Sequence, residues 1–110
     1  MDITAPTGTV VRATGDGTVS FAEWNSGYGR LVIIDHGNGY HTWYAHLSRM
    51  NVLPGQEIRQ GAVVGLVGSS GRVTAPHLHY EVRVGNVAVN PTKYMNRPAI
   101  LEASKKDLPF

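Results

Sequence analysis

Short apolar, β-branched and aromatic runs recur along the chain, and glycine or proline interrupts them about every eight to twelve residues. The runs predict strands at residues 9–14, 17–24, 30–35, 40–46, 62–67, 77–84 and 86–89. The Gly85-Asn86 pair predicts a tight hairpin between the last two strands. No stretch carries the apolar stripe of an amphipathic helix, and only a helical turn near residues 91–95 is expected. The pattern therefore predicts an all-β fold, an antiparallel sandwich or partly open barrel.

Residues 53–66 predict two glycine-centred turns around a strand of two or three residues, followed by a second strand. This arrangement resembles the hammerhead unit of barrel-sandwich hybrid folds, which biotinyl and lipoyl carrier domains also contain. Those carriers need a modifiable lysine at a hairpin tip. No lysine lies between Met1 and Pro91, so the carrier interpretation is excluded and only the likeness in fold remains.

Composition narrows the class of protein further. The chain has 110 residues, 42% hydrophobic and 16% charged, which indicates one globular domain, neither disordered nor membrane-spanning. Because cysteine is absent, a disulfide scaffold and a cysteine metal site are both excluded. The net charge of +2 mildly favours an anionic partner such as a cell wall or nucleic acid. A protein surface with a few extra lysines explains this small net charge better, and no nucleic-acid partner is expected.

The pattern changes near Arg97-Pro98, where proline interrupts the chain. We expect a domain over residues 1–95 and a C-terminal tail over residues 96–110, with a weak helix around residues 100–106. The first residues lack the basic and apolar regions of a signal peptide. The abrupt start suggests a fragment of a longer, secreted protein.

His77-Leu78-His79 is the densest chemical signal. Alternate residues of a strand share one face about 6.5–7 Å apart, so the two imidazoles are expected side by side. The opposite face is apolar, which supports the strand prediction, and Glu81 shares the histidine face. A pair of this kind suits a metal ligand beside a general acid or base, although two surface histidines can also meet by chance.

His46 and Asp2 are weaker signals when each is considered alone. Strand alternation predicts that His46 shares a face with Tyr44 and Thr42, while His41 and Trp43 face the other way. A single histidine at a strand end is more often structural, and an aspartate at the second position is more often solvated. Zinc does accept His nitrogen and Asp oxygen together, with one coordination position left open.

Several ordered segments together resemble the lysostaphin-type (LytM-like) zinc metallopeptidases over residues 1–95. The segments that carry the resemblance are Asp2-Ile3, Ala5-Pro6-Thr7-Gly8-Thr9, Gly27-Tyr28-Gly29-Arg30, Tyr44-Ala45-His46-Leu47, Pro76-His77-Leu78-His79-Tyr80-Glu81 and Asn90-Pro91. The resemblance implies a zinc endopeptidase that hydrolyses peptide crosslinks of bacterial peptidoglycan, and hence an extracytoplasmic location.

The resemblance also implies roles for particular residues. Asp2 and His79 correspond to zinc ligands, and His46 and His77 correspond to the histidines beside the open zinc position. Tyr28, Arg72 and Thr74 border the expected substrate groove. Glu81 either orients His79 or is an ordinary solvated sheet residue. His36, in a turn, and His41 are not expected to bind zinc.

The family's first ligand is a histidine four residues before the aspartate, a position that precedes Met1. Truncation explains this best, because His46, His77 and His79 are all present, and the chain is expected to bind zinc weakly. A second hypothesis is a non-catalytic domain that binds peptidoglycan or regulates an amidase. A third is a phosphoryl-carrying domain of sugar transport, which the Leu78-His79-Tyr80 and Ala5–Thr9 segments fit less well. The scissile bond and the oligomeric state stay open.

Overall fold

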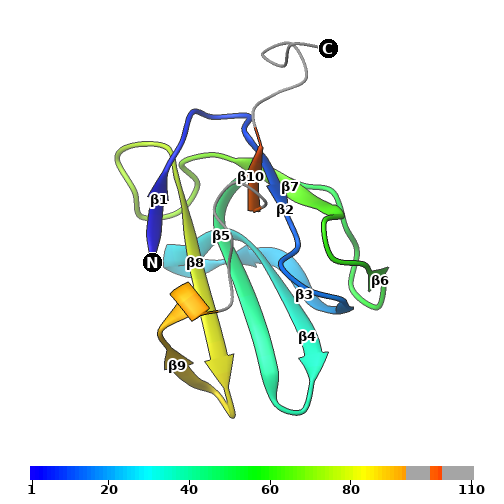
Figure 1. The fold of residues 1–110 in the computed structure, drawn as a ribbon. Helices are drawn as coiled ribbons and strands as arrows, with labels where there is room; N and C mark the ends of the chain where they lie inside the picture. The colour runs from blue at the N-terminus through cyan, green and yellow to red at the C-terminus, as the bar shows by residue number, and fades with distance from the viewer. Residues whose placement is uncertain (94–99, 103–110) are drawn as a thin grey trace.

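The computed structural model describes residues 1–93 and 100–102 and has ten strands with two short 3₁₀ turns (Figure 1). All pairings between the strands are antiparallel. The elements are β1 (Asp2–Thr4), β2 (Val10–Arg12), β3 (Gly17–Asn25), η1 (Ser26–Tyr28), β4 (Gly29–Gly37), β5 (Tyr40–Met50), β6 (Glu57–Ile58), β7 (Val63–Val67), β8 (His77–Val84), β9 (Val87–Val89), η2 (Pro91–Lys93) and β10 (Leu101–Glu102). The predicted all-β antiparallel fold is confirmed.

β5 organises the sheet because its two halves pair with different strands. One edge of β5 pairs with β4, while on the other edge residues 40–45 pair with β8 and Leu47–Met50 pair with β7. β8 in turn pairs with β1 and β9, and β7 pairs with β2, which carries β10. Figure 1 shows β1 beside β8 at one side of the molecule and β6 at the other. His46 therefore lies where β5 changes partners.

The core draws on both halves of the sheet. Leu78, Tyr80 and Val82 from β8 are buried in the same cluster as Val64 and Val67 from β7. These β8 residues form the apolar face that alternation predicts, so burial of apolar area fixes the register of the strand. The opposite face of β8 consequently presents His77, His79, Glu81 and Arg83 away from the core.

A chain of polar contacts crosses this core between β5 and β8. Thr14 Oγ1 lies 2.8 Å from the hydroxyl of Tyr80 and 3.2 Å from that of Tyr44. The Tyr44 hydroxyl also contacts Thr42, whose hydroxyl lies 2.6 Å from His36 Nε2. Because burial disfavours the phenolate, it raises the pKa of both tyrosines. His36, which was expected in a turn, lies in β4 and supports the core through its contact with Thr42.

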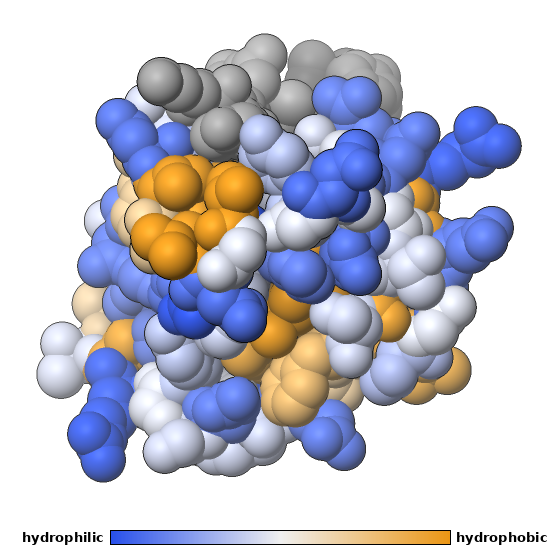
Figure 2. All heavy atoms as spheres, turned by 90° about the horizontal axis from the view of Figure 1, so that it is seen from below, coloured by the Kyte–Doolittle hydropathy of each residue, from blue (hydrophilic) through white to orange (hydrophobic). Residues whose placement is uncertain are grey.

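The predicted Gly85-Asn86 hairpin is present, with φ of 58° and 66° at its two central residues and with Val84 paired to Val87. Figure 2, viewed from below Figure 1, shows mostly hydrophilic residues on that face, with apolar residues gathered in several separate areas. Among the residues described, no helix is long and apolar enough to cross a membrane.

Three expectations about the chain ends have different outcomes. The helical turn expected near residues 91–95 is present as η2, over its first three residues. The weak helix around residues 100–106 is wrong at Leu101 and Glu102, because these residues pair with β2 as β10. The predicted boundary at residues 95–96 lies outside the described residues, and Ile100, beyond it, is buried in the core.

Candidate metal and substrate site

The candidate site is a groove of about 970 Å³ between two loops and the edge of the sheet formed by β1 and β8. Residues 25–28 and 71–75 form its two walls. The groove is also lined by Asp2, His46, His77 and His79. All seven residues predicted for the site therefore border one groove, since Tyr28, Arg72 and Thr74 lie in its walls.

Tight backbone contacts hold the two walls together. The Arg72 amide donates to the Gly27 carbonyl at 3.0 Å. A Cβ atom at Gly71 would lie 2.5 Å from the Gly27 carbonyl oxygen, and one at Gly29 would lie 2.4 Å from the Ser70 carbonyl carbon. Both glycines have positive φ, which glycine adopts without strain. These two glycines thus allow an approach that fixes the width of the groove.

Asp2 reaches the histidines because β1 pairs with β8. The register places Asp2 directly opposite His79, with Asp2 Oδ1 2.7 Å from His79 Nδ1 and 3.5 Å from His77 Nε2. The hydrogen bond with His79 lowers the pKa of Asp2, although burial opposes it. Asp2 is therefore a carboxylate at neutral pH. Its neighbours are the two imidazoles of the His77-Leu78-His79 motif.

His46 also contacts this pair, but strand alternation alone does not place it there. Regular alternation would put His46 on the core face with Tyr44, so the sequence-based face assignment is wrong. At His46 φ is 62°, in the left-handed region, and the pairing of β5 shifts register on either side of it. The irregularity brings the His46 ring to 4.9 Å from that of His77 and 6.0 Å from that of His79.

Hydrogen bonds to backbone carbonyls set the tautomers of His46 and His77. His46 Nδ1 lies 2.7 Å from the Ser70 carbonyl, and His77 Nδ1 lies 3.0 Å from the Ala75 carbonyl. A carbonyl only accepts, so each Nδ1 carries a proton, and in the neutral ring the lone pair is on Nε2. Burial lowers the pKa of His46, against the opposing effect of the Ser70 contact. His46 is therefore neutral at pH 7 and able to accept a proton.

Ser70 is a site residue that the sequence analysis missed. Besides its contact with His46, its hydroxyl donates to the Leu47 carbonyl at 2.6 Å and accepts from the Arg30 amide at 3.0 Å. The only sequence signal was the glycine-serine turn at residues 68–71. That turn predicts a loop and does not indicate that the loop orients a histidine.

The remaining predicted residues surround the groove or lie away from it. Tyr28 packs edge-on against Trp43 at 5.4 Å, and burial raises the pKa of its hydroxyl, as does Glu81. Arg72 and Thr74 are exposed in the wall. His41 lies on the face of Trp43, as predicted, but outside the groove, 3.7 Å from Asp35.

The side chains in the groove include the atom types, imidazole nitrogen and carboxylate oxygen, that bind a metal ion such as zinc. Among the described residues, no group of three or more His, Asp or Glu side chains is arranged as a metal site. Asp2 and His79 nevertheless offer the oxygen and nitrogen that zinc accepts. Each ring nitrogen of His79 contacts a carboxylate. Asp2 Oδ1 lies 2.7 Å from Nδ1, and Glu81 Oε2 lies 2.6 Å from Nε2. A protonated imidazole donates to both carboxylates, whereas a neutral one donates to only one and leaves the other nitrogen free to bind a cation.

A model of one family matches residues 1–91, and its description is Peptidase family M23. The chain belongs to Peptidase family M23. The DD-carboxypeptidase/endopeptidase Mpg of Neisseria gonorrhoeae is 46% identical over 106 residues, which cover 96% of the chain and 24% of that protein. The murein hydrolase activator EnvC of Escherichia coli is 40% identical over 97 residues, covering 88% of the chain and 23% of EnvC. The M23 chain thus spans about a quarter of the length of these relatives.

Solved structures agree with the family assignment. A zinc-containing peptidase from Vibrio cholerae superposes with a TM-score of 0.78 at 40% identity, covering 80% of this M23 chain and 27% of that one. The catalytic domain of lysostaphin from Staphylococcus simulans gives a TM-score of 0.80 at 33% identity, covering 84% and 74%. The resemblance to lysostaphin-type peptidases is therefore confirmed at the level of family and fold.

Proposed function

We propose that this M23 domain is a zinc-dependent endopeptidase that hydrolyses peptide crosslinks of bacterial peptidoglycan. The observation that carries the proposal is the meeting of Asp2, His46, His77 and His79 at one end of an open groove. A relative named DD-carboxypeptidase/endopeptidase and a solved relative named a zinc-containing peptidase support it. Such a substrate places the protein in the bacterial cell envelope.

Asp2 and His79 would hold the zinc ion through a carboxylate oxygen and Nδ1. Bound zinc supplies a water of lowered pKa and polarises the scissile carbonyl. The described residues provide two of the three protein ligands that catalytic zinc sites use. The family motif assigns the third to a histidine four residues before Asp2.

His46 and His77 would move the protons. Each keeps an Nε2 lone pair at the groove, because its Nδ1 proton is held by a backbone carbonyl. One imidazole can accept a proton from the attacking water at Nε2 and later donate it to the leaving amine. The other would stabilise charge on the carbonyl oxygen in its protonated form, with Nε2–H as the donor. The lowered pKa of His46 suits the accepting role.

The walls of the groove would bind the peptide. Among the described residues that line the groove, Arg72 is the one Lys or Arg side chain, and it is exposed there. It would attract a carboxylate of the stem peptide, and Tyr28 and Thr74 would contact the backbone of the substrate.

The test is hydrolysis of purified, crosslinked muropeptides, followed by mass spectrometry. The assay uses zinc and the chain preceded by His-Ala-Ala, which places a histidine four positions before Asp2. We expect cleavage into uncrosslinked peptides, and we expect His77→Ala to lower kcat about 10²- to 10⁴-fold. His41→Gln, outside the groove, serves as the matched control and is expected to leave the rate unchanged. Equal rates for the His77→Ala variant and the parent would contradict the proposal.

A second function has one specific observation in its favour, the 40% identity to a protein named a murein hydrolase activator. In that case the domain would bind peptidoglycan or an amidase without cleaving. Absence of cleavage by the zinc-loaded, His-extended chain, together with retention on peptidoglycan, would favour this alternative.

A further inference from the structure

A chain of polar contacts leads from His79 away from the groove along one face of β8. Glu81 Oε2 lies 2.6 Å from His79 Nε2, and Glu81 Oε1 accepts from Arg83 Nε at 2.9 Å and Nη2 at 2.8 Å. The guanidinium of Arg83 lies over the ring of Trp43, 3.8 Å from its centroid. Trp43 is the cross-strand partner of Glu81 on β5. The strand period of two thus aligns His79, Glu81 and Arg83 on one face of β8, with the Arg83 guanidinium on the Trp43 ring.

The two carboxylates that contact His79 are held very differently. The Glu81 side chain is 12% exposed, whereas that of Asp2 is 65% exposed. Glu81 also accepts from the Tyr28 hydroxyl at 3.1 Å, so its acceptor sites are engaged in a fixed geometry. A buried carboxylate is costly unless it is paired in this way. Glu81 is consequently the more rigid acceptor for an imidazole proton.

The position of the single proton on neutral His79 decides what the other nitrogen can do. With the proton on Nε2, directed at Glu81, the lone pair on Nδ1 points toward Asp2 and the groove. With the proton on Nδ1, directed at Asp2, no lone pair is available where a metal ion would bind.

We propose that Glu81, itself held by Arg83 on Trp43, is a positioning residue that fixes the Nε2–H tautomer and the ring orientation of His79. The importance of this tautomer for metal binding rests on the proposed function, because it assumes that His79 is a ligand. The tautomer itself does not depend on that assumption. Arg83 acts on His79 only indirectly, through Glu81, with which it forms an ion pair.

The first measurement is the ¹⁵N and ¹H NMR spectrum of the histidine side chains in the metal-free 110-residue chain, recorded at alkaline pH where the ¹⁵N shifts show a single proton on the His79 ring. We expect His79 to carry its proton on Nε2, with a downfield proton signal typical of a bond to a carboxylate. Glu81→Met removes the acceptor with little change in length, and we expect the proton to move to Nδ1. Glu81→Gln keeps an acceptor oxygen and is expected to retain the Nε2–H tautomer with a weaker downfield shift.

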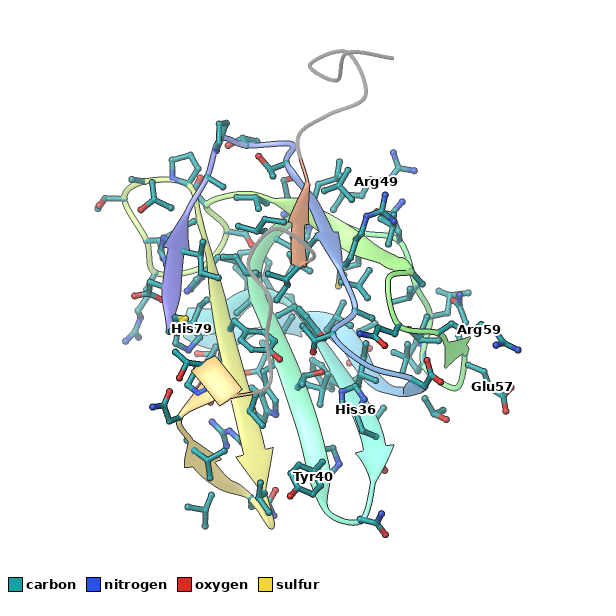
Figure 3. All side chains as sticks on the ribbon, viewed as in Figure 1. His36, Tyr40, Arg49, Glu57, Arg59 and His79 are labelled. Carbon is teal, nitrogen blue, oxygen red and sulfur yellow. The ribbon has the colours of Figure 1, made fainter. Side chains whose placement is uncertain are left out.

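The second measurement is zinc affinity, by competition with a chromogenic chelator. We expect Glu81→Met to weaken zinc binding by about 10- to 100-fold and Glu81→Gln by less. Arg83→Met, which keeps an apolar stem over Trp43, is expected to resemble Glu81→Gln. Glu57→Met is the matched control, because Glu57 is exposed and lies at the opposite side of the molecule from His79 (Figure 3).

The outcomes separate this inference from the proposed function. If Glu81→Met keeps the Nε2–H tautomer of His79 and the zinc affinity of the parent, the positioning role is wrong even where hydrolysis is observed. If the tautomer moves as expected but no chain cleaves muropeptides, the positioning role stands and the proposed function fails. Thermal unfolding of each variant identifies any that fails to fold, and Glu81→Gln and Arg83→Met then carry the test.

Discussion

At the scale of single residues, His46 shows how a local irregularity builds the site. Its φ of 62° is uncommon for a residue with a Cβ atom and carries a conformational cost of about 1–2 kcal/mol. The surrounding contacts maintain it, since Ser70 accepts from Nδ1 and β5 is paired on both sides. The strain occurs where the imidazole must leave the core face and join His77.

This strain can be measured by comparing two truncations of His46. Both His46→Ala and His46→Gly remove the imidazole, but only glycine adopts positive φ without cost. We expect His46→Gly to have a free energy of unfolding about 1 kcal/mol higher than that of His46→Ala, measured by urea denaturation. The control is Ala45→Gly, where φ is ordinary and glycine should destabilise. An Ala variant as stable as the Gly variant would show that the backbone at His46 is not strained.

At the scale of elements, the two faces of β8 have different roles, one in the core and one in the site, and β5 pairs beside it. One face of β8 contributes Leu78, Tyr80 and Val82 to the core, and the other contributes the histidines. Since the two faces alternate within one strand, the packing of the core fixes the direction of the site residues. The buried hydroxyls of Tyr44 and Tyr80 meet at Thr14 and tie β5 and β8 together.

Burial of these two tyrosines predicts a loss of stability in alkaline solution. Their pKa is raised in the folded state, so folding favours the protonated phenol. The stabilisation is complete below the unfolded pKa of about 10 and is lost as the pH rises above it, because the unfolded chain then gains from ionisation. We expect the urea midpoint to fall between about pH 9.5 and 11.5. Tyr44→Phe should lower stability near pH 8 but reduce this fall. An unchanged slope in that variant would contradict the assignment.

Elements with a clear period, or short ones between clear turn signals such as β6 and β9, were predictable from the sequence, whereas β1 and β10 were not. The alternation in residues 77–84 predicted β8 and both of its faces, and Gly85-Asn86 predicted the hairpin. β1 and β10 have three and two residues, too few for a period, and their pairing with β8 and β2 creates them. Alternation failed at His46 because nothing in its neighbours marks the irregular backbone.

At the scale of the whole molecule, the groove gathers segments that are far apart in sequence. β1 supplies Asp2, the irregular segment of β5 supplies His46, and β8 supplies His77 and His79, while two loops form the walls. Composition and spacing alone could identify these residues as candidates but could not predict that they lie close together in space. The ordered motifs did predict this proximity, because their resemblance to a known family implied a common fold. The contacts of Ser70, Arg83 and Trp43 could not be predicted from the sequence, because they depend on the three-dimensional arrangement of the loops and strands.

The most direct test of the central claim is the zinc affinity of the chain preceded by His-Ala-Ala, compared with the same chain preceded by Ala-Ala-Ala. We predict that the histidine extension binds one zinc ion more tightly than the alanine extension, because it supplies the third ligand beside Asp2 and His79. Replacing Asp2 or His79 by alanine should remove that advantage, whereas His41→Gln should preserve it. Equal affinities of the two extended chains, or tight zinc binding that survives the loss of both Asp2 and His79, would contradict the account.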